Sequence, residues 1–357
     1  MNNLYKITLT CLVLSACKVE KIVHQNPQTK PVVALVADAE TEPVTSFDDA
    51  ADDPCVWVNP TDVTKSTIIG TNKKEGLEVY NLEGERLYSY KIGRVNNVDI
   101  RDGFSLNGKE VSVVTASNRT HNTISILIVR PTGELEDAAA RKISSNLKEV
   151  YGLGMYKSPK TNKLYVFMVG KKGGVEQWEL FENNTQIDAK LVREFSLGSQ
   201  GEGIVADDVH AKVYIGEEDK ALWKYDAEPN AENNRVKVIS TNGLNMKDDF
   251  EGVTLYDAGN GKGYIILSSQ GNNSYAVFDR ISNQYLGSFS LKDGVIDGTY
   301  DTDGIDVTSV NFGTKYPKGF FIAQDGANTQ DKDSLHQNFK LVDWQKISKS
   351  LHLDSSN

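Results

Sequence analysis

The sequence predicts an all-β protein, a six-bladed β-propeller of four-stranded antiparallel blades. From residue 48 onward, short runs of β-branched and aromatic residues alternate with turns rich in Asn, Gly and Lys, and no stretch has a long helical period. The strand pattern also repeats at steps of about 50 residues, which is typical of propeller blades. A large sandwich or jelly roll is the alternative, and the regular step disfavours it.

The repeat is clearest in the second half of the chain. Each copy has an apolar strand, a polar turn, a second apolar strand, a charged loop and a third strand with an aromatic residue. A glycine precedes the first strand of each copy, at Gly152, Gly203, Gly252 and Gly304. Two more copies fit between Asp52 and Val150, which gives six blades in a closed ring without exposed sheet edges. Short helical turns are expected at residues 136–141 and 343–350.

Both ends of the chain are expected to lie outside a propeller domain of residues 48–350. Residues 1–17 read as a lipoprotein signal peptide: Lys6 is followed by an apolar run too short to span a bilayer, and Leu14-Ser15-Ala16-Cys17 reads as a lipobox. Cys17 is then the lipidation site, and the protein is anchored to a bacterial membrane in the cell envelope, at the outer membrane or cell surface. A plain secretory signal is the alternative. Residues 18–47 are expected to be a flexible tether, and residues 351–357 a tail.

The composition is that of an ordinary globular protein: 357 residues, 25% charged, 39% hydrophobic, with a net charge of −10. The negative balance argues against a nucleic-acid partner, but bound cations can reverse the local field at a phosphate site. Only Cys55 of the three cysteines lies in the body, so no disulfide can form there, and a buried thiol is expected. A monomer is expected, since a closed propeller needs no partner for its edges.

Acidic and basic clusters recur at the blade spacing. Equivalent loops of a propeller open on one face around the central channel, so groups far apart in sequence converge there. Three carboxylates stand immediately before a blade-opening glycine, namely Glu202, Glu251 and Asp303. Carboxylates suit Ca²⁺, and Lys and Arg suit phosphate. The pattern therefore predicts a shared site for metal-assisted chemistry on a polyphosphate.

An ordered series of motifs resembles the β-propeller phytases from residue 48 to about residue 347. The series begins with Asp49-Ala50-Ala51-Asp52-Asp53-Pro54, Thr71-Asn72-Lys73-Lys74, Asn96-Asn97-Val98-Asp99 and Ala116-Ser117-Asn118-Arg119. It continues with Glu149-Val150-Tyr151-Gly152, Gly201-Glu202-Gly203, Glu217-Glu218-Asp219, Asp249-Phe250-Glu251-Gly252, Asp297-Gly298-Thr299, Asp301-Thr302-Asp303-Gly304-Ile305-Asp306 and Ala323-Gln324-Asp325-Gly326.

The resemblance implies a six-bladed propeller and a calcium-dependent phosphoric monoester hydrolase of the 3-phytase type. Its substrate is phytate, myo-inositol hexakisphosphate, free or as the calcium salt, which it converts to lower inositol phosphates and phosphate. In this family several Ca²⁺ ions line the top of the channel, and a calcium-bound water attacks phosphorus directly without a phosphoenzyme. Two neighbouring phosphate subsites favour substrates with adjacent phosphates.

The resemblance also implies roles for single residues. The implied calcium-site residues are Asp53, Val98 through its carbonyl, Asp99, Glu202, Glu218, Asp249, Glu251 and Asp297. The residues implied near the bound phosphates are Lys73, Arg119, Tyr151, Lys171 and Asp303. Catalytic roles fall to Asp303, Glu218, Lys73 and Arg119, and Asp52 and Asn97 are expected neighbours of the same centre. Lys172 departs from the family pattern, because many members carry an acidic residue there.

Two other classes of function stay open from the residues. A propeller lactonase or sugar-acid hydrolase needs one central metal with few basic groups, so Lys73, Arg119 and Lys171 argue against it. The second class is a non-catalytic, calcium-dependent binding propeller. Such a protein would not need the full acidic cluster, so the presence of the cluster argues against this class.

Overall fold

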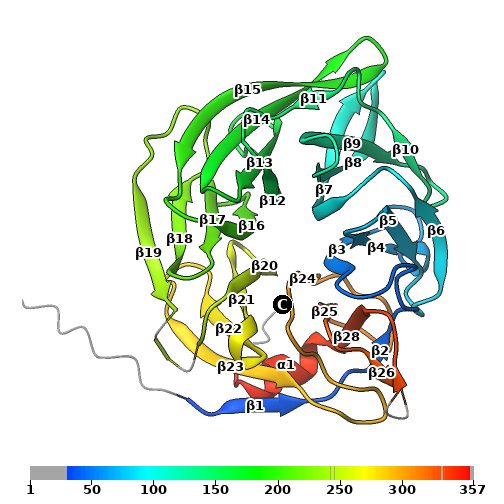
Figure 1. The fold of residues 1–357 in the computed structure, drawn as a ribbon, viewed down its shortest axis with the longest axis vertical. Helices are drawn as coiled ribbons and strands as arrows, with labels where there is room; N and C mark the ends of the chain where they lie inside the picture. Colours follow the sequence, from blue (N-terminus) through cyan, green and yellow to red (C-terminus); the bar gives the residue numbers. More distant parts are fainter. Residues whose placement is uncertain (1–29, 242, 245, 331–332, 354–357) are drawn as a thin grey trace, which may run out of the picture.

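The computed structural model describes residues 30–353 except 242, 245, 331 and 332. Its main sheets surround a central axis as the six blades of a ring, shown end-on in Figure 1. The predicted six-bladed propeller of antiparallel blades is thus confirmed. The expected signal peptide and its lipidation site, Cys17, lie outside the described residues. No helix in the described part of the chain is long and apolar enough to cross a membrane.

The first three blades follow the chain from the innermost strand outward. Blade one contains β3 (Ala51–Trp57), β4 (Thr67–Asn72), β5 (Gly76–Tyr80) and β6 (Arg86–Tyr90). Blade two contains β7 (Val95–Leu106), β8 (Lys109–Asn118), β9 (Thr123–Val129), β10 (Leu135–Asp137) and the short β11 (Ile143–Ser144). Blade three contains β12 (Val150–Lys157), β13 (Leu164–Gly170), β14 (Gly174–Asn183) and β15 (Gln186–Ser196).

The remaining blades keep the same order, except that the last ones also take strands from the start of the chain. Blade four contains β16 (Gly201–Asp207), β17 (Lys212–Glu217), β18 (Ala221–Asp226) and β19 (Arg235–Ser240). Blade five contains β20 (Phe250–Gly259), β21 (Lys262–Ser269), β22 (Ser274–Asp279), β23 (Tyr285–Leu291) and β1 (Val32–Leu35). Blade six contains β24 (Ile305–Val307), β25 (Phe320–Asp325), β28 (Asn338–Asp343) and β2 (Ala39–Glu40).

The ring is closed by the N-terminal part of the described chain. Strand β2 pairs antiparallel with β28, with Ala39 opposite Leu341, and completes blade six. Strand β1 pairs parallel with β23 as a fifth strand of blade five. The prediction of a tether up to residue 47 is therefore wrong for its described part. These strands are short, and their partners lie some 250 to 300 residues away, so no local pattern marks them.

The helical expectations had opposite outcomes. Helix α1 (Trp344–Ser350) confirms the turn expected at 343–350; Asp343 caps it by accepting a hydrogen bond from the Gln345 amide. The turn expected at 136–141 is wrong, because β10 occupies residues 135–137 and pairs with β9. Buried Leu135 holds this segment in the sheet, and tertiary pairing overrides the helical preference of its alanines.

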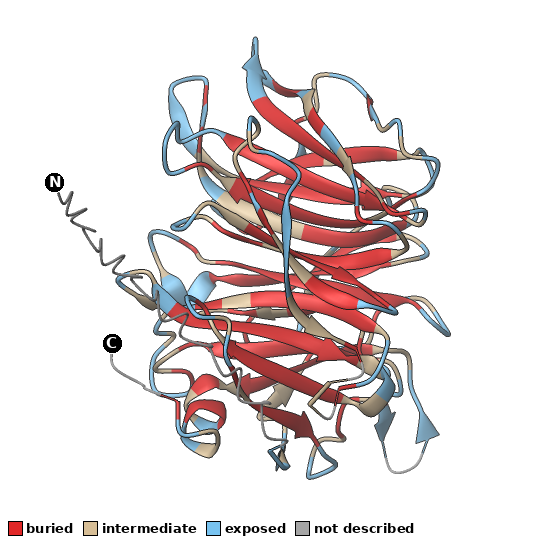
Figure 2. Cartoon of the chain, turned by 90° about the vertical axis from the view of Figure 1, so that its left-hand side faces the viewer, coloured by how far each residue is buried: buried red, intermediate tan, exposed pale blue. Residues whose placement is uncertain are grey.

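Apolar side chains pack between neighbouring blades. One cluster joins blades two and three through residues such as Ile126, Val166 and Met168. Figure 2 shows the result from the side, with buried strands stacked through the molecule and exposed residues mostly in the loops. The single thiol of the body, Cys55, is a free and buried cysteine on this inner framework, as expected.

The innermost strands share an irregularity that shapes the channel mouth. In each of blades one to five the pairing skips residues near the start of the strand, which marks a β-bulge. The skips fall between Ala51 and Pro54, Val95 and Val98, Val150 and Leu153, Gly201 and Ile204, and Phe250 and Val253. We call the first residue inside each skip the bulge position. These positions hold Asp52, Asn96, Tyr151, Glu202 and Glu251, and Asp303 has the corresponding place before β24.

In blades three to six a glycine follows the bulge position and allows adjacent blades to touch through their backbones. A Cβ atom on Gly203 would lie 2.0 Å from the carbonyl oxygen of Glu251, and one on Gly152 would lie 1.9 Å from that of Glu202. The amide of Gly252 donates a hydrogen bond to the carbonyl oxygen of Asp303 at 2.7 Å. The recurring glycines are thus required by close approach between blades, and this contact fixes the spacing of the bulge positions.

Candidate active site and metal centre

A cavity of about 410 Å³ opens at the bulge positions. Residues from blades one, three, four, five and six line it, together with the segment before β3. The lining residues used below are Asp49, Lys73, Tyr151, Glu218, Asp249, Glu251, Gln270, Asp303 and Gln324. Of the predicted phosphate and metal residues, the structure brings six to this cavity, namely Lys73, Tyr151, Glu218, Asp249, Glu251 and Asp303.

A second set of equivalent residues completes this site. The residue directly after the second strand of each blade, here called the exit position, donates its amide to a carbonyl just before the innermost strand. For example, Lys73 donates to Ala50 at 2.6 Å, and Glu218 donates to Gln200 at 3.2 Å. The exit positions in blade order are Lys73, Arg119, Lys171, Glu218, Gln270 and Gly326.

Three buried carboxylates form the carboxylate cluster, defined as Glu202, Glu218 and Glu251. One oxygen from each lies within 4.8 Å of the others. Glu202 accepts a hydrogen bond from Asn96 at 2.5 Å, and Glu218 accepts one from the Gln200 side chain at 2.8 Å. One oxygen of Glu218 and one of Glu251 have no hydrogen-bond partner in the described part of the chain.

Burial and mutual repulsion keep these groups from all being ionised. Burial first, and then the charge of Glu202, raise the pKa of Glu218 to about 8. The same two causes raise the pKa of Glu251 and of the neighbouring Asp52. A divalent cation would remove this repulsion, and the free oxygens of the cluster offer it ligands. Hard oxygen donors at this spacing fit Ca²⁺.

A more exposed acidic group adjoins the carboxylate cluster. Oxygens of Asp219, Asp248 and Asp249 also lie within 4.8 Å of one another. Burial, and then the neighbouring Asp219, raise the pKa of Asp249. The carbonyl of Asp249 accepts a hydrogen bond from the Gln270 amide at 3.0 Å, which ties this loop to the next exit position.

Lys73 and Asp303 form the central ion pair of the cavity. The Lys73 ammonium lies 2.7 Å from Asp303 Oδ2 and 3.4 Å from Asp52 Oδ2. The Gln270 side chain donates to the other Asp303 oxygen at 2.7 Å, and Gln324 accepts from the Asp303 amide at 2.8 Å. Burial raises the pKa of Asp303 to about 7, although Lys73 opposes this shift. Burial alone would lower the pKa of Lys73, but Asp52 and Asp303 raise it, so the ammonium is retained.

A basic wall faces these carboxylates and consists of Arg119, Tyr151 and Lys171. The Arg119 guanidinium lies 5.5 Å and the Lys171 ammonium 4.7 Å from the centre of the Tyr151 ring, both in cation–π contact. Arg119 also donates to the Asn96 side chain at 3.1 Å. Burial, and then Glu202 and Glu251, raise the pKa of the Tyr151 phenol, which therefore stays a hydrogen-bond donor. Lys172, next to this wall, is exposed.

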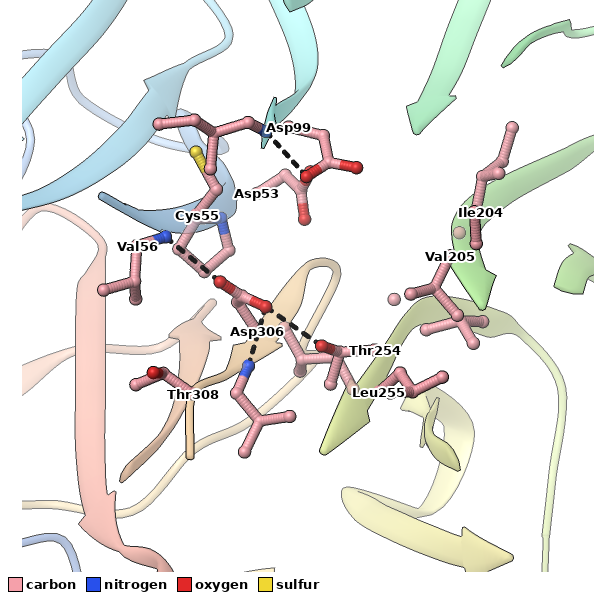
Figure 3. A pocket seen from close by; sticks show the side chains of 18 of the residues that line it. Asp53, Cys55, Val56, Asp99, Ile204, Val205, Thr254, Leu255, Asp306 and Thr308 are labelled. Carbon is pink, nitrogen blue, oxygen red and sulfur yellow. Dashed lines mark hydrogen bonds between the residues drawn. The ribbon is translucent and has the colours of Figure 1, made fainter. Parts of the chain in front are cut away.

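Three predicted metal residues lie deeper, in a channel cavity of about 320 Å³ shown in Figure 3. Asp53 accepts a hydrogen bond from the Val98 amide at 3.1 Å. Asp99 pairs with Arg101 at 2.9 Å and accepts from the Met155 amide at 2.7 Å. Asp306, to which the sequence analysis assigned no role, joins them; burial and then Asp99 raise its pKa to about 7.

Asp297 lies apart from both cavities. It contacts the fully buried Lys340 ammonium and accepts from the Thr329 amide at 2.6 Å. Lys340 also contacts Glu40 and the Asn328 side chain. Asn97 is buried beside the site, where its amide donates to the Ser117 hydroxyl at 3.0 Å.

Sequence reasoning missed Asp49, Gln270 and Gln324, which line the main cavity. Gln270 was detectable, because it follows its strand as Lys73 and Glu218 follow theirs. Asp49 belongs to a quoted motif, but it precedes the blade and has no equivalent in the repeat. Gln324 also belongs to a quoted motif, but a neutral amide in a strand gives no signal of a role at the site.

Fold and site together define a propeller hydrolase that combines hard-cation ligands with phosphate-binding cations. The sequence model of the Phytase family matches residues 3–356. The chain is 46% identical over 325 residues to the 3-phytase of Bacillus subtilis strain 168, covering 89% of this chain and 85% of that protein. The chain belongs to the phytase family, and it is a phosphoric monoester hydrolase.

Solved structures agree on the fold. The calcium-binding protein regucalcin from Agrobacterium tumefaciens matches with a TM-score of 0.53 over 87% of this chain and 95% of that one. The two sequences are only 11% identical, so this likeness concerns the propeller architecture alone.

Proposed function

We propose that this family member is a calcium-dependent phytase that releases phosphate from myo-inositol hexakisphosphate. One observation carries the proposal: free oxygens of Glu218 and Glu251 line the same cavity as Lys73 and as Tyr151, whose ring Arg119 and Lys171 contact. The 3-phytase of Bacillus subtilis, 46% identical, supports the choice of substrate.

The proposed calcium ligands of the cavity are Glu202, Glu218, Glu251 and Asp249. Calcium bound there would neutralise phosphate charge and lower the pKa of a coordinated water. Asp53, the Val98 carbonyl and Asp99 are proposed to serve a cation in the channel. Asp297 is proposed to serve one beside Asn328, where Lys340 offsets only part of the charge of Glu40, Asp297 and Asp325.

The protein's own side chains orient the substrate and manage its charge. Arg119 offers a planar pair of donors to phosphate oxygens, and Lys171 and Lys73 add point charges. Tyr151 supplies a neutral donor between them. Asp303, held through both oxygens by Lys73 and Gln270, can take a proton from an incoming water or return one to the leaving inositol oxygen. Phosphoryl transfer needs positioning and charge stabilisation, which this arrangement provides.

Phosphate release from sodium phytate at neutral pH tests the proposal, with millimolar calcium and with EDTA. Turnover that requires calcium, and that Asp303→Ala abolishes in a folded protein, supports it. Absence of turnover in both conditions would leave a calcium-dependent binding propeller as the function. Unchanged turnover in EDTA would rule out the calcium requirement.

We also propose, from the sequence of residues 1–17, that Cys17 carries lipid and anchors a monomeric protein in a bacterial envelope. Metabolic labelling with a fatty acid tests this point. Label that Cys17→Ser removes supports the anchor, and an unlabelled, released protein points to a plain secretory signal.

A further inference from the structure

The Lys73 ammonium is crowded by protein carboxylates. It lies 2.5 Å from Asp49, 2.7 Å from Asp303 and 3.4 Å from Asp52. The ammonium donates a hydrogen bond to Asp303, and Asp49 and Asp52 lie within ion-pair distance of it. A phosphate oxygen that approaches Lys73 therefore competes with these carboxylates for the ammonium.

The three carboxylates differ in how easily they can leave. The Asp52 and Asp303 side chains are only 2% and 15% exposed, and Gln270 also holds Asp303. The Asp49 side chain is 74% exposed, and Lys73 is the one ion-pair partner that the described part of the chain gives it. Asp49 is thus the one carboxylate that can turn into solvent.

The backbone keeps Asp49 beside the cavity even when its side chain moves. The amides of Ala50 and Ala51 both donate to the Gln337 side chain, at 2.7 and 2.9 Å. The Lys73 amide donates to the Ala50 carbonyl at 2.6 Å. Both Asp49 and Gln337 line the cavity, so the carboxylate occupies space that a ligand on Lys73 would need.

We propose that Asp49 is a specificity-determining residue whose carboxylate holds the place of a phosphate oxygen on Lys73 and is displaced by the phosphate group of the substrate. This inference rests on the proposed function of the same cavity. An exposed ion pair is weak, and a phosphate dianion makes stronger charge-assisted bonds, so the exchange is feasible. Asp49 competes for the Lys73 ammonium with the phosphate product as well as with the substrate. It therefore also limits how long the product stays bound.

Replacement of Asp49 by Asn tests the proposal, with inorganic phosphate as the probe. Phosphate binding to the full chain is measured by calorimetry at saturating calcium, and as competitive inhibition of phytate hydrolysis. We expect Asp49→Asn to bind phosphate about two- to fivefold more tightly, the change that corresponds to the usual strength of an exposed ion pair. The KM for phytate is expected to fall by a similar factor.

The neighbouring Asp48 offers a matched control. Its side chain is 88% exposed and pairs with Lys74 at 3.3 Å, and neither residue lines the cavity. Asp48→Asn removes the same charge one residue away, at a backbone position with positive φ that Asn also tolerates. Phosphate affinity is expected to stay at the wild-type value in Asp48→Asn.

Three outcomes would overturn the inference. Weaker phosphate binding in Asp49→Asn would show that Asp49 assists the ligand. An equal gain in phosphate affinity in Asp48→Asn would show that the loss of one negative charge, and not the contact between Asp49 and Lys73, causes the effect. A loss of calcium affinity in Asp49→Asn, measured by titration without phosphate, would make Asp49 a metal ligand. Phosphate binding is independent of turnover, so an inactive wild type that still shows the expected pattern would contradict only the proposed function.

Discussion

Blades one to three and blades four to six use the same two backbone positions for opposite chemistry. The exit positions of the first three blades carry Lys73, Arg119 and Lys171, whereas blade four carries Glu218 and blade five Gln270. The bulge positions of blades four and five add Glu202 and Glu251. The propeller thus fixes where side chains meet, and the residue type at each position decides which half presents basic groups and which presents carboxylates.

The two halves also differ in how complete they are without a ligand. Arg119 and Lys171 already rest on the Tyr151 ring, and Arg119 bonds Asn96. The carboxylate cluster instead contains free buried oxygens and carboxyl groups with raised pKa values. The metal dependence of the main cavity should therefore reside in the acidic half, and mutations in the two halves should separate it from substrate affinity.

The largest effect is expected in the acidic half. Glu251→Gln keeps the shape but removes a charge from the carboxylate cluster, and we expect turnover of phytate to fall about a thousandfold. Calcium should also raise the melting temperature less in this variant. Glu232→Gln, at an exposed glutamate in the β18–β19 loop, is the control. Wild-type turnover in Glu251→Gln would contradict the assignment of metal dependence to the acidic half.

The shared backbone frame should be the next most sensitive element. In Gly203→Ala the new methyl group would lie 2.0 Å from the Glu251 carbonyl oxygen, so the blades must separate. We expect a loss of about 2–3 kcal/mol in the free energy of unfolding, measured by denaturant titration. In Gly243→Ala the new methyl group would lie 3.3 Å from its nearest neighbour, the Ser240 carbonyl oxygen. This variant should lose much less free energy of unfolding. Equal losses would mean that contact between blades is not the cause.

The basic half should govern affinity for the substrate. Arg119→Ala is expected to lower kcat/KM for phytate by about ten- to a hundredfold, because a two-pronged phosphate contact is lost. The increase in melting temperature on adding calcium should be unchanged. Arg119→Lys should recover only part of the activity, since an ammonium cannot bind two oxygens side by side. A reduced calcium response in Arg119→Ala would contradict the division into halves.

The last prediction concerns the pH dependence of stability in the metal-free protein. The pKa of Glu218 is about 8 in the folded state against 4.5 ordinarily, so the folded state holds a proton that the unfolded state loses. The free energy of unfolding should therefore fall as pH rises from about 4.5 through 8 in EDTA. With calcium the trend should reverse, because binding requires ionised carboxylates. Melting curves recorded across this pH range, in EDTA and in calcium, test the direction of both trends.

The sequence predicted those parts that repeat. Glu202, Glu251 and Asp303 could be grouped because each stands before a glycine whose spacing marks a blade. Gln270 escaped notice, since a neutral amide gives no compositional signal although its position is equivalent to that of Lys73. Strands β1 and β2 could not be predicted, because Val32 and Ala39 acquire partners only when the two ends of the chain meet. Asp297 matched a motif, but only three-dimensional contacts reveal that its neighbour is the Lys340 ammonium.

The backbone contact between successive bulges has a consequence for ion selectivity. Glycines of one blade already touch carbonyl oxygens of the next, so the backbones that carry Glu202 and Glu251 cannot approach each other further. A small ion such as Mg²⁺ demands oxygens at about 2.0–2.1 Å in a strict octahedron, whereas Ca²⁺ accepts about 2.3–2.6 Å and irregular geometry. At the proposed calcium site, this limit on backbone approach would favour the larger ion. Backbone contacts that do not involve the ion would thus contribute to the selectivity for Ca²⁺ over Mg²⁺.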